Sequence, residues 1–354
     1  MEIKGNKGEL SELYAFFKLL ADGRIYSGDG ELNRYAKKYY PILEIFRDDT
    51  EVRNTYRIQT ENESILVIGE QINIEIPQAR FLQEAQILLE NIKKDKTDYS
   101  YLETFLQEID CTKIKAKSKD KADIRLVIHN FNNGTISELG YSIKSRLGAP
   151  STLINSNKNG TNFIYEIEGI TSEQAEKCNN LDKFKNKFAF LQSIGADILF
   201  VQSASEILHN NLTLLDLGLE RIIAFELLEY YKGNNKTLVD ITKQITMDDP
   251  LCIMCNTSQP MYEYKIKQFL LAFALGMTSS TPWNGNFNAN GGYIVVKEDG
   301  DIVCYHFFDR NDLENYFFNN TYFDTPSTTR HQFGDIYQQD GKFYIKLNMQ
   351  VRFK

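Results

Sequence analysis

Residues 121–148 contain two runs in which apolar and polar side chains alternate. Alternation with a period of two predicts half-buried strands. The Asn133-Gly134 dipeptide lies between the runs and is the strongest short-range signal for a tight hairpin, because both turn residues need positive φ. The stretch is therefore predicted to be an antiparallel hairpin, with these residues on its apolar face: Ile124, Leu126 and Ile128 in the first strand, and Leu139, Tyr141 and Ile143 in the second.

The register of this hairpin decides which polar side chains meet. With a two-residue loop, Asn132 faces Thr135, and the same register places Asp123 directly opposite Lys144. Side chains opposite each other in such a ladder have Cβ atoms about 4.5–5.5 Å apart. The pair has two readings. It can be a cross-strand ion pair, or the carboxylate can hold Mg²⁺ while the lysine stabilises charge or orients water near a phosphate.

The segments before the hairpin are predicted to mix helices and strands. Apolar residues recur at helical spacing in 8–22, and Gly23 is suited to end that helix. The further expected elements are a helix at 32–46, strands near 52–59, 64–69 and 72–76, a helix that Pro77 opens, and a short helix at 99–109.

After the hairpin, Ser151 is suited to cap a short helix at 151–155. The other expected elements are a strand from 162, helices at 172–193, 212–231 and 261–277, a strand at 196–202 suited to the buried edge of the core sheet, and C-terminal hairpins that turn at 298–300 and 340–341. Gly233 and its two following asparagines are the best candidate linker.

The composition is that of a globular protein with one large domain or two. The chain has 354 residues, of which 42% are hydrophobic, and carries no long uncharged apolar run or signal-like N-terminus. We therefore expect a soluble, cytoplasmic protein without membrane contact. The net charge of −8 argues against passive, non-specific binding of nucleic acid, but it allows a local basic groove.

A lysine cluster precedes Asp123, and it is either a solvated loop or guarded edge strand, or a contact for phosphates. It consists of Lys113, Lys115, Lys117, Lys119 and Lys121. Cys252 and Cys255 have CxxC spacing but no second pair and no nearby histidine. We expect reduced, buried thiols rather than a zinc site. The sequence has no P-loop, GxGxxG or HExxH motif, so it does not support nucleotide hydrolysis or zinc proteolysis.

The sequence KAD, followed after a turn by SIK, resembles the PD-(D/E)xK nuclease core, in which an acid opens one strand and an acid-x-Lys sequence lies on the next. Three longer stretches resemble the HpaII-type restriction endonucleases: GNKGELSELYAFFKLLADGRIYSGDG, GYSIKSRLGAPSTLINSNKNGTNFIYEIEG and YIKLNMQVRF. The resemblance implies an α/β (α+β) fold with a mixed sheet flanked by helices. Residues 1–235 would form the catalytic core, and residues 236–354 a C-terminal helix-and-β-hairpin unit that recognises DNA.

The resemblance also implies roles for individual residues. Asp123 would hold Mg²⁺ together with the Ile143 carbonyl, and Lys144 would position the attacking water. Glu12, with Glu9 as second choice, would hold a water or a second metal. Ser142 stands where the core usually has Asp or Glu, so the missing carboxylate comes from elsewhere or is not needed. Glu12 is the favoured substitute; the others are Glu138, Glu166 and Glu168.

DNA contacts are expected beyond the second strand of the hairpin, where a scissile phosphate would lie. Ser145, Arg146, Asn155 and Asn162 have side chains typical of phosphate and base-edge contacts. Arg330, in a polar C-terminal loop, is the residue expected at a guanine edge, because a bidentate arginine is the commonest specific contact with guanine.

The resemblance implies a type II restriction endonuclease. It would depend on Mg²⁺ and cleave double-stranded DNA at a short palindrome, expected to be CCGG. It would act as a homodimer, or as a monomer that acts twice. A cognate methyltransferase would act on the same site without needing to bind the enzyme. One alternative is a PD-(D/E)xK nuclease of repair or junction resolution, which the size and the acidic charge disfavour. Another is a non-catalytic DNA-binding protein, which would not need the Asp123–Lys144 pair.

Overall fold

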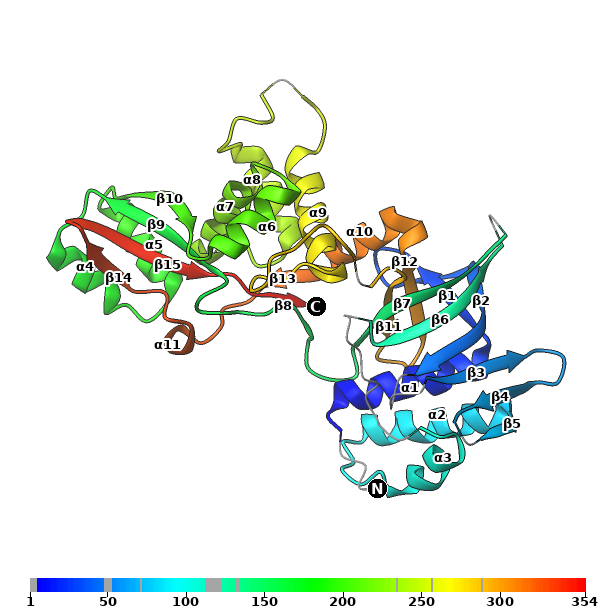
Figure 1. The fold of residues 1–354 in the computed structure, drawn as a ribbon. Helices are drawn as coiled ribbons and strands as arrows, with labels where there is room; N and C mark the ends of the chain where they lie inside the picture. Colours follow the sequence, from blue (N-terminus) through cyan, green and yellow to red (C-terminus); the bar gives the residue numbers. More distant parts are fainter. Residues whose placement is uncertain are drawn as a thin grey trace. The chain divides into compact units, whose positions relative to one another are not determined.

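The computed structural model describes residues 5–47, 53–70, 72–111, 122–131, 134–233, 235–255, 257–287 and 289–354. The chain forms two compact units (Figure 1). Unit 1 comprises Met1–Ser151 and Phe287–Tyr316, and unit 2 comprises Thr152–Asn286 and Phe317–Lys354. Each unit is therefore built from two separate segments, and this division differs from the boundary predicted after residue 235.

Unit 1 is organised around a mixed sheet with the order β1-β12-β11-β7-β6-β2-β3-β4-β5, in which β1 also pairs with β2. The second strand of the predicted hairpin, β7, pairs antiparallel with β6 and parallel with β11. The expected mixed α/β fold is thus confirmed. The strands are β1 (Arg24–Gly28), β2 (Arg34–Arg47), β3 (Asn54–Gln59), β4 (Ser64–Ile68), β5 (Asn73–Pro77), β6 (Ile124–Asn130), β7 (Thr135–Ser145), β11 (Gly292–Val296) and β12 (Ile302–His306).

Helices α1 (Lys7–Asp22) and α2 (Gln78–Lys93) lie side by side against this sheet, with α3 (Glu103–Glu108) near α2 (Figure 1). Asn6 and Glu9 form a capping box at the start of α1, and Gly23 ends it with a φ of 62°. The apolar stripe of α1 is buried in one core with the apolar face of the hairpin. The predicted helices at 8–22, after Pro77 and at 99–109, and the predicted strands from 52 to 76, are confirmed.

The predicted helix at 32–46 is wrong, because Arg34–Arg47 form the long strand β2. Its apolar residues also fit a period of two where they are most buried, at Tyr40 and Ile42. The first part of β2 pairs with β1, and the second part pairs with β6 and β3. Pairing with strands on both sides, together with a content of aromatic and β-branched residues, outweighed the helical spacing.

Unit 2 contains two small antiparallel sheets and a group of helices. The sheets have the orders β10-β9-β15-β14 and β13-β16-β8. The strands are β8 (Thr152–Ile154), β9 (Asn162–Glu168), β10 (Asp197–Ser203), β13 (Thr321–Phe323), β14 (Ile336–Gln339), β15 (Lys342–Asn348) and β16 (Val351–Phe353). The helices are α4 (Ser172–Asn179), α5 (Phe184–Ser193), α6 (Glu206–Leu215), α7 (Leu219–Lys232), α8 (Leu238–Asp248), α9 (Met261–Leu275) and α11 (Thr328–His331); α10 (Arg310–Asn319) runs from unit 1 into unit 2.

Several predictions for unit 2 need correction. Residues 152–154 form strand β8 rather than a helix capped by Ser151. The helices expected at 172–193 and 212–231 are each interrupted, giving α4 and α5, and α6 and α7. Strand β10 exists, but it is the edge of the four-stranded sheet of unit 2, and its Leu199 is 48% exposed. The hairpin of β11 and β12, assigned by sequence to the C-terminal unit, belongs to the sheet of unit 1.

Two expectations concern the whole chain. Across the described ranges, no helix is long and apolar enough to cross a membrane. Cys252 and Cys255 are free but exposed, in contrast to the expected burial, whereas Cys111, Cys178 and Cys304 are buried.

Candidate active site

The predicted hairpin is present, but its register differs from the prediction by two residues. Asn130 pairs with Thr135, and Ile124 pairs with Tyr141. The loop is therefore longer than the two residues Asn133 and Gly134 that were expected to form it; Asn132 and Asn133 lie outside the described residues. Because the shift is even, every side chain keeps its predicted face. Asp123 lies beside Ser142 instead of opposite Lys144.

The second strand of the hairpin fixes the carboxylate of Asp123. Its Oδ2 atom accepts hydrogen bonds from the Ser142 hydroxyl at 3.0 Å and from the Ile143 backbone N–H at 2.7 Å. The Asp123 N–H donates to the carbonyl of Tyr141 at 2.8 Å. Hydrogen bonds to an ionised acceptor are among the stronger ones in proteins, so the carboxylate is held in one orientation. Ser142 is 4% exposed, and Asp123 is half-buried.

Lys144 lies two residues further along the same face. Within the described residues its ammonium has no carboxylate within 4.0 Å, so the ion-pair reading of Asp123 and Lys144 is not observed. Its Nζ instead lies 5.6 Å from the centre of the Tyr293 ring, within the range of a cation–π contact.

Tyr293 is a residue of this site that the sequence did not reveal. It is 3% exposed and pairs with Ser142 in the parallel ladder between β11 and β7. A hydrogen bond joins it to the side chain of Ser142. Burial, with smaller effects of Tyr316 and Asp123, raises the pKa of the Tyr293 phenol well above its ordinary value, so the hydroxyl keeps its proton at neutral pH. A tyrosine about 150 residues from the hairpin has no local signal that links it to Ser142.

The donor set around Asp123 is compatible with one hard cation. Both hydrogen bonds to the carboxylate from the described part of the chain fall on Oδ2, so Oδ1 is available to a ligand. The backbone of Ile143 lies next to the carboxylate. No group of three or more His, Cys, Asp and Glu side chains suited to a metal occurs among the residues that the structure describes. Mg²⁺ commonly binds through one or two carboxylates and completes its shell with waters and phosphate oxygens, which this set permits.

The structure places the other predicted acids as follows. Glu12 is half-buried on α1, the helix that packs against β7. Glu9 accepts the Asn6 N–H at 3.1 Å, so its side chain serves the helix cap. Glu138, on the outer face of the hairpin, forms an ion pair with Arg53 at 3.0 Å. Glu166 and Glu168 lie on β9 in unit 2, where Glu166 pairs with Lys342 at 2.8 Å.

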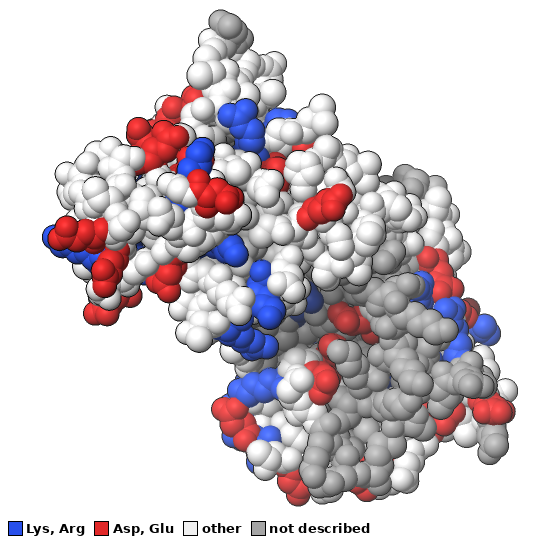
Figure 2. Space-filling model, turned by 60° about the vertical axis from the view of Figure 1, so that its left-hand side comes forward, with Lys and Arg blue, Asp and Glu red and all other residues white. Residues whose placement is uncertain are grey.

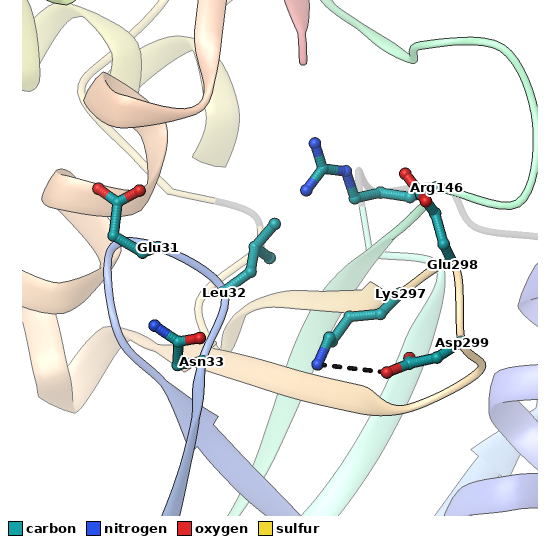
Figure 3. A pocket seen from close by; sticks show the side chains of 7 residues that line it. All are labelled: Glu31, Leu32, Asn33, Arg146, Lys297, Glu298 and Asp299. Atoms are coloured by element: carbon teal, nitrogen blue, oxygen red, sulfur yellow. Dashed lines mark ion pairs between the residues drawn. The ribbon is translucent and has the colours of Figure 1, made fainter.

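A cavity of about 390 Å³ lies at the end of β7 beyond Lys144 (Figure 3). Arg146 projects from that end toward the loop that carries Glu31 and Leu32. Lys297 lines the same cavity and forms an ion pair with Asp299 at 3.6 Å. The Ser145 hydroxyl accepts the Leu147 N–H at 3.1 Å and so shapes the turn that follows β7. Arg146 thus lines a hollow next to the candidate site together with the acids Glu31, Glu298 and Asp299, and its expected contact with a phosphate stays a prediction.

In unit 2, Arg330 is exposed on the short helix α11. Its side chain has no ion pair among the described residues. The adjacent His331 anchors this helix: its Nε2 lies 3.1 Å from the Ser156 hydroxyl, and its carbonyl accepts the Asn162 side chain at 3.1 Å. Burial, and the charge of Arg330, lower the pKa of His331.

Asn162, predicted to contact DNA, is instead buried in unit 2. It is 1% exposed, and its amide also donates to the Lys158 carbonyl and accepts from Asn348 at 2.6 Å. Asn155 is exposed just after β8. The buried amide of Asn348 thus binds that of Asn162, which in turn binds the His331 carbonyl of α11. Arg330 of the same helix is exposed at the surface.

Surface charge adds little to the search for a DNA contact. Acidic and basic side chains both occur on the face drawn in Figure 2, and most of the described residues on that face are uncharged. The lysine cluster before Asp123 (Lys113, Lys115, Lys117, Lys119 and Lys121) lies outside the described residues. Its expected contact with phosphates stays a prediction.

Comparison with known proteins decides the family. The family model described as HpaII restriction endonuclease matches residues 6–353. The chain belongs to the HpaII restriction endonuclease family. It is 40% identical over 353 residues to the type II restriction enzyme HpaII of Haemophilus parainfluenzae, covering 99% of this chain and 98% of that protein. No solved structure matches the chain. As a member of the HpaII restriction endonuclease family, the protein is a type II restriction endonuclease, and the sequence-based assignment of the family is confirmed.

Proposed function

We propose that this restriction endonuclease uses the hairpin of β6 and β7 as a PD-(D/E)xK-type active site, requires Mg²⁺, and cleaves double-stranded DNA at CCGG. The observation that carries the proposal is the fixed carboxylate of Asp123. The Ser142 hydroxyl and the Ile143 N–H hold it in place, and Lys144 lies on the same face. The expected CCGG site comes from the resemblance to the HpaII type, and not from this geometry.

Asp123 and the backbone of Ile143 would hold the cation. When bound, Mg²⁺ supplies neutralisation of the phosphate charge and a more acidic water, which are the main needs of phosphodiester hydrolysis. Lys144 carries an ammonium that no acid of the described residues neutralises, so it can position the attacking water. The Ser142 hydroxyl donates a hydrogen bond to Asp123 and therefore orients the carboxylate instead of acting as a nucleophile. Glu12 remains our candidate for holding a water or a second metal.

Residues of both units would contact the DNA. Arg146 would bind a phosphate from the hollow beyond β7, with Ser145 and Asn155 as further polar contacts. Arg330 would read a guanine edge from α11. Because the expected site is palindromic, we propose that two copies of the chain act as a homodimer, one on each strand. A cognate methyltransferase would protect the same site.

Digestion of a plasmid of known sequence tests the proposal. We expect discrete fragments with Mg²⁺ and none with EDTA, ends that map to CCGG, and protection of a plasmid methylated at that site. Lys144→Ala should abolish cutting, whereas Lys94→Ala, which removes an exposed lysine directly after α2 that is paired with Glu90, should not. Sedimentation should give a dimer on cognate DNA. Fragments at another site would overturn CCGG, and full cutting by Lys144→Ala would overturn the assigned active site.

A further inference from the structure

We infer that Tyr293 is a positioning residue of the active site. Its ring holds the Lys144 ammonium, and its hydroxyl holds Ser142 and, through Ser142, the carboxylate of Asp123. The inference rests on the function proposed above for the hairpin and extends it to a strand that is distant in sequence. Strand β11 brings Tyr293 beside Ser142 and Val295 beside Lys144 in a parallel ladder. Residues two apart on a strand share a face, so the tyrosine lies on the same face as both active-site side chains.

The two ends of the tyrosine have different contacts. The ring lies under the Lys144 ammonium, with 5.6 Å between Nζ and the ring centre. The hydroxyl joins the Ser142 side chain, which in turn donates to Asp123 at 3.0 Å. Tyr293 is 3% exposed, so its ring cannot swing away without disturbing the buried packing around it. One rigid side chain therefore touches the site at two points.

This arrangement suits a site that has a serine in place of the usual second acid. A second carboxylate would attract the lysine and orient the first carboxylate through a shared cation. Serine has no charge, and so Lys144 needs another partner to define its position. An aromatic face attracts an ammonium without neutralising it, which leaves its full charge for water or phosphate. The Tyr293 hydroxyl similarly fixes the rotamer of Ser142, and thereby the hydrogen bond to Asp123.

Two substitutions separate the ring from the hydroxyl. Tyr293→Phe keeps the ring under Lys144 and removes only the link to Ser142, whereas Tyr293→Leu removes both. The matched control is Tyr305→Phe, since Tyr305 is fully buried on the next strand, pairs with Tyr293, and donates its hydroxyl to the Asp29 carbonyl at 2.6 Å. Tyr293→Phe and Tyr305→Phe each lose the contact of one buried hydroxyl, but only Tyr293→Phe changes the active site.

The readouts are single-turnover cleavage, DNA affinity without a divalent metal, and thermal unfolding. Misplacement of a reacting group by about 1 Å can cost about 100-fold in rate. We expect kcat to fall about 10-fold in Tyr293→Phe and about 100-fold in Tyr293→Leu, with KM and metal-free affinity within about two-fold of the parent. Tyr293→Phe should also need more Mg²⁺ for half-maximal rate. Tyr305→Phe should lose similar thermal stability and keep its kcat.

The inference is overturned if Tyr293→Phe and Tyr293→Leu cut at the parent rate, or if Tyr305→Phe loses as much activity as Tyr293→Phe. If Tyr293→Leu does not fold, the comparison of Tyr293→Phe with Tyr305→Phe decides. Lys144→Ala separates the two levels of argument. Parent activity in Lys144→Ala refutes the proposed active site itself, whereas loss of activity there, with unchanged Tyr293 variants, refutes only the role of Tyr293.

Discussion

The two units hold their candidate functional groups in different ways. In unit 1, Asp123 is oriented by the backbone and a buried side chain of the neighbouring strand, and Lys144 lies against a buried ring. In unit 2, Arg330 is exposed on a four-residue helix that a buried network of amides supports through His331. The first arrangement fixes the reacting group itself. The second fixes only the backbone of α11, and the exposed side chain of Arg330 can move to reach DNA.

This contrast separates the expected effects of substitution. Groups that act on the scissile phosphate should change the rate at saturating DNA, because their contribution appears in the transition state. A group that reads a base should change affinity and site choice. Because the chain is acidic, with a net charge of −8, binding cannot depend on overall charge, so single contacts such as Arg330 should have measurable effects.

The largest effect is expected at Asp123. Asp123→Asn keeps an oxygen that can accept from Ser142 and Ile143, so the hairpin should fold, but the negative charge is lost. We expect cleavage with Mg²⁺ to fall by about 1,000-fold or more, in keeping with the loss of about 10,000-fold that removal of a catalytic aspartate can cause, and metal-free DNA binding to be unchanged or tighter. The control is Glu138→Gln on the same hairpin, which should cut within two-fold of the parent. Strong loss in Glu138→Gln would make Glu138 the missing acid.

Arg330 should give the next largest effect. A bidentate contact with guanine is worth about 1–3 kcal/mol, so Arg330→Ala should lower kcat/KM at the cognate site about 5- to 150-fold while kcat at saturating DNA is retained. Discrimination against sites that differ by one base pair should fall as well. Arg221→Ala, which removes another exposed arginine of unit 2, on α7, should have little effect. Equal loss in both variants would show a general charge effect instead of base reading.

His331 should have a smaller effect, and only through Arg330. His331→Ala removes a hydrogen bond to Ser156 of the kind that contributes about 0.5–1.5 kcal/mol, so we expect kcat/KM to fall about 2- to 10-fold. The double variant Arg330→Ala/His331→Ala should be no worse than Arg330→Ala alone. His209→Ala, which breaks the contact with Glu220 at 2.8 Å, is the matched control. Additive losses in the double variant would give His331 an independent role.

The hairpin shows how far sequence alone can reach. Alternation gave both strands and the faces of their side chains, since it depends only on local periodicity. The register depended on the number of loop residues, and the Asn-Gly signal suggested two. Asn130 in fact pairs with Thr135, so the partner of Asp123 is Ser142. The family-derived choice of Asp123 and Lys144 was insensitive to this difference, because a shift by two residues preserves the face.

The remaining parts of the two sites depend on contacts between distant segments. Tyr293 reaches Ser142 only through the parallel pairing of β11 with β7, and Asn162 reaches α11 only through the tertiary packing of unit 2. Neither has a local pattern that differs from ordinary strand or loop residues. The same limit explains β2, whose apolar spacing fitted a helix until its pairing partners on both sides were known.

Substitution of Glu226 should have the smallest effect on activity and a large effect on stability. Like Asp123 it is a carboxyl group, but it is buried in the core of unit 2 and not at the candidate active site. Glu226 is fully buried on α7, accepts one hydrogen bond from Thr242 at 2.6 Å, and has a second oxygen without a partner in the described structure. Burial raises its pKa to about 8 from an ordinary value of 4.5. The folded protein therefore holds a proton there that the unfolded chain releases above pH 4.5, which stabilises the fold at low pH and is lost as the pH rises toward 8.

Glu226→Gln cannot ionise, and its amide can still accept from Thr242. At pH 5 we expect the free energy of unfolding to stay close to that of the parent, measured by urea denaturation. At pH 8 the variant should be more stable by up to a few kcal/mol, since each pKa unit corresponds to about 1.4 kcal/mol. Glu229→Gln, three residues along the same helix and paired with Lys232, should not flatten the pH dependence. If the parent and Glu226→Gln lose stability in parallel from pH 5 to 8, Glu226 is already ionised in the folded protein. Glu226→Gln should cut within two-fold of the parent, because Glu226 is buried in unit 2 and Asp123 lies in unit 1.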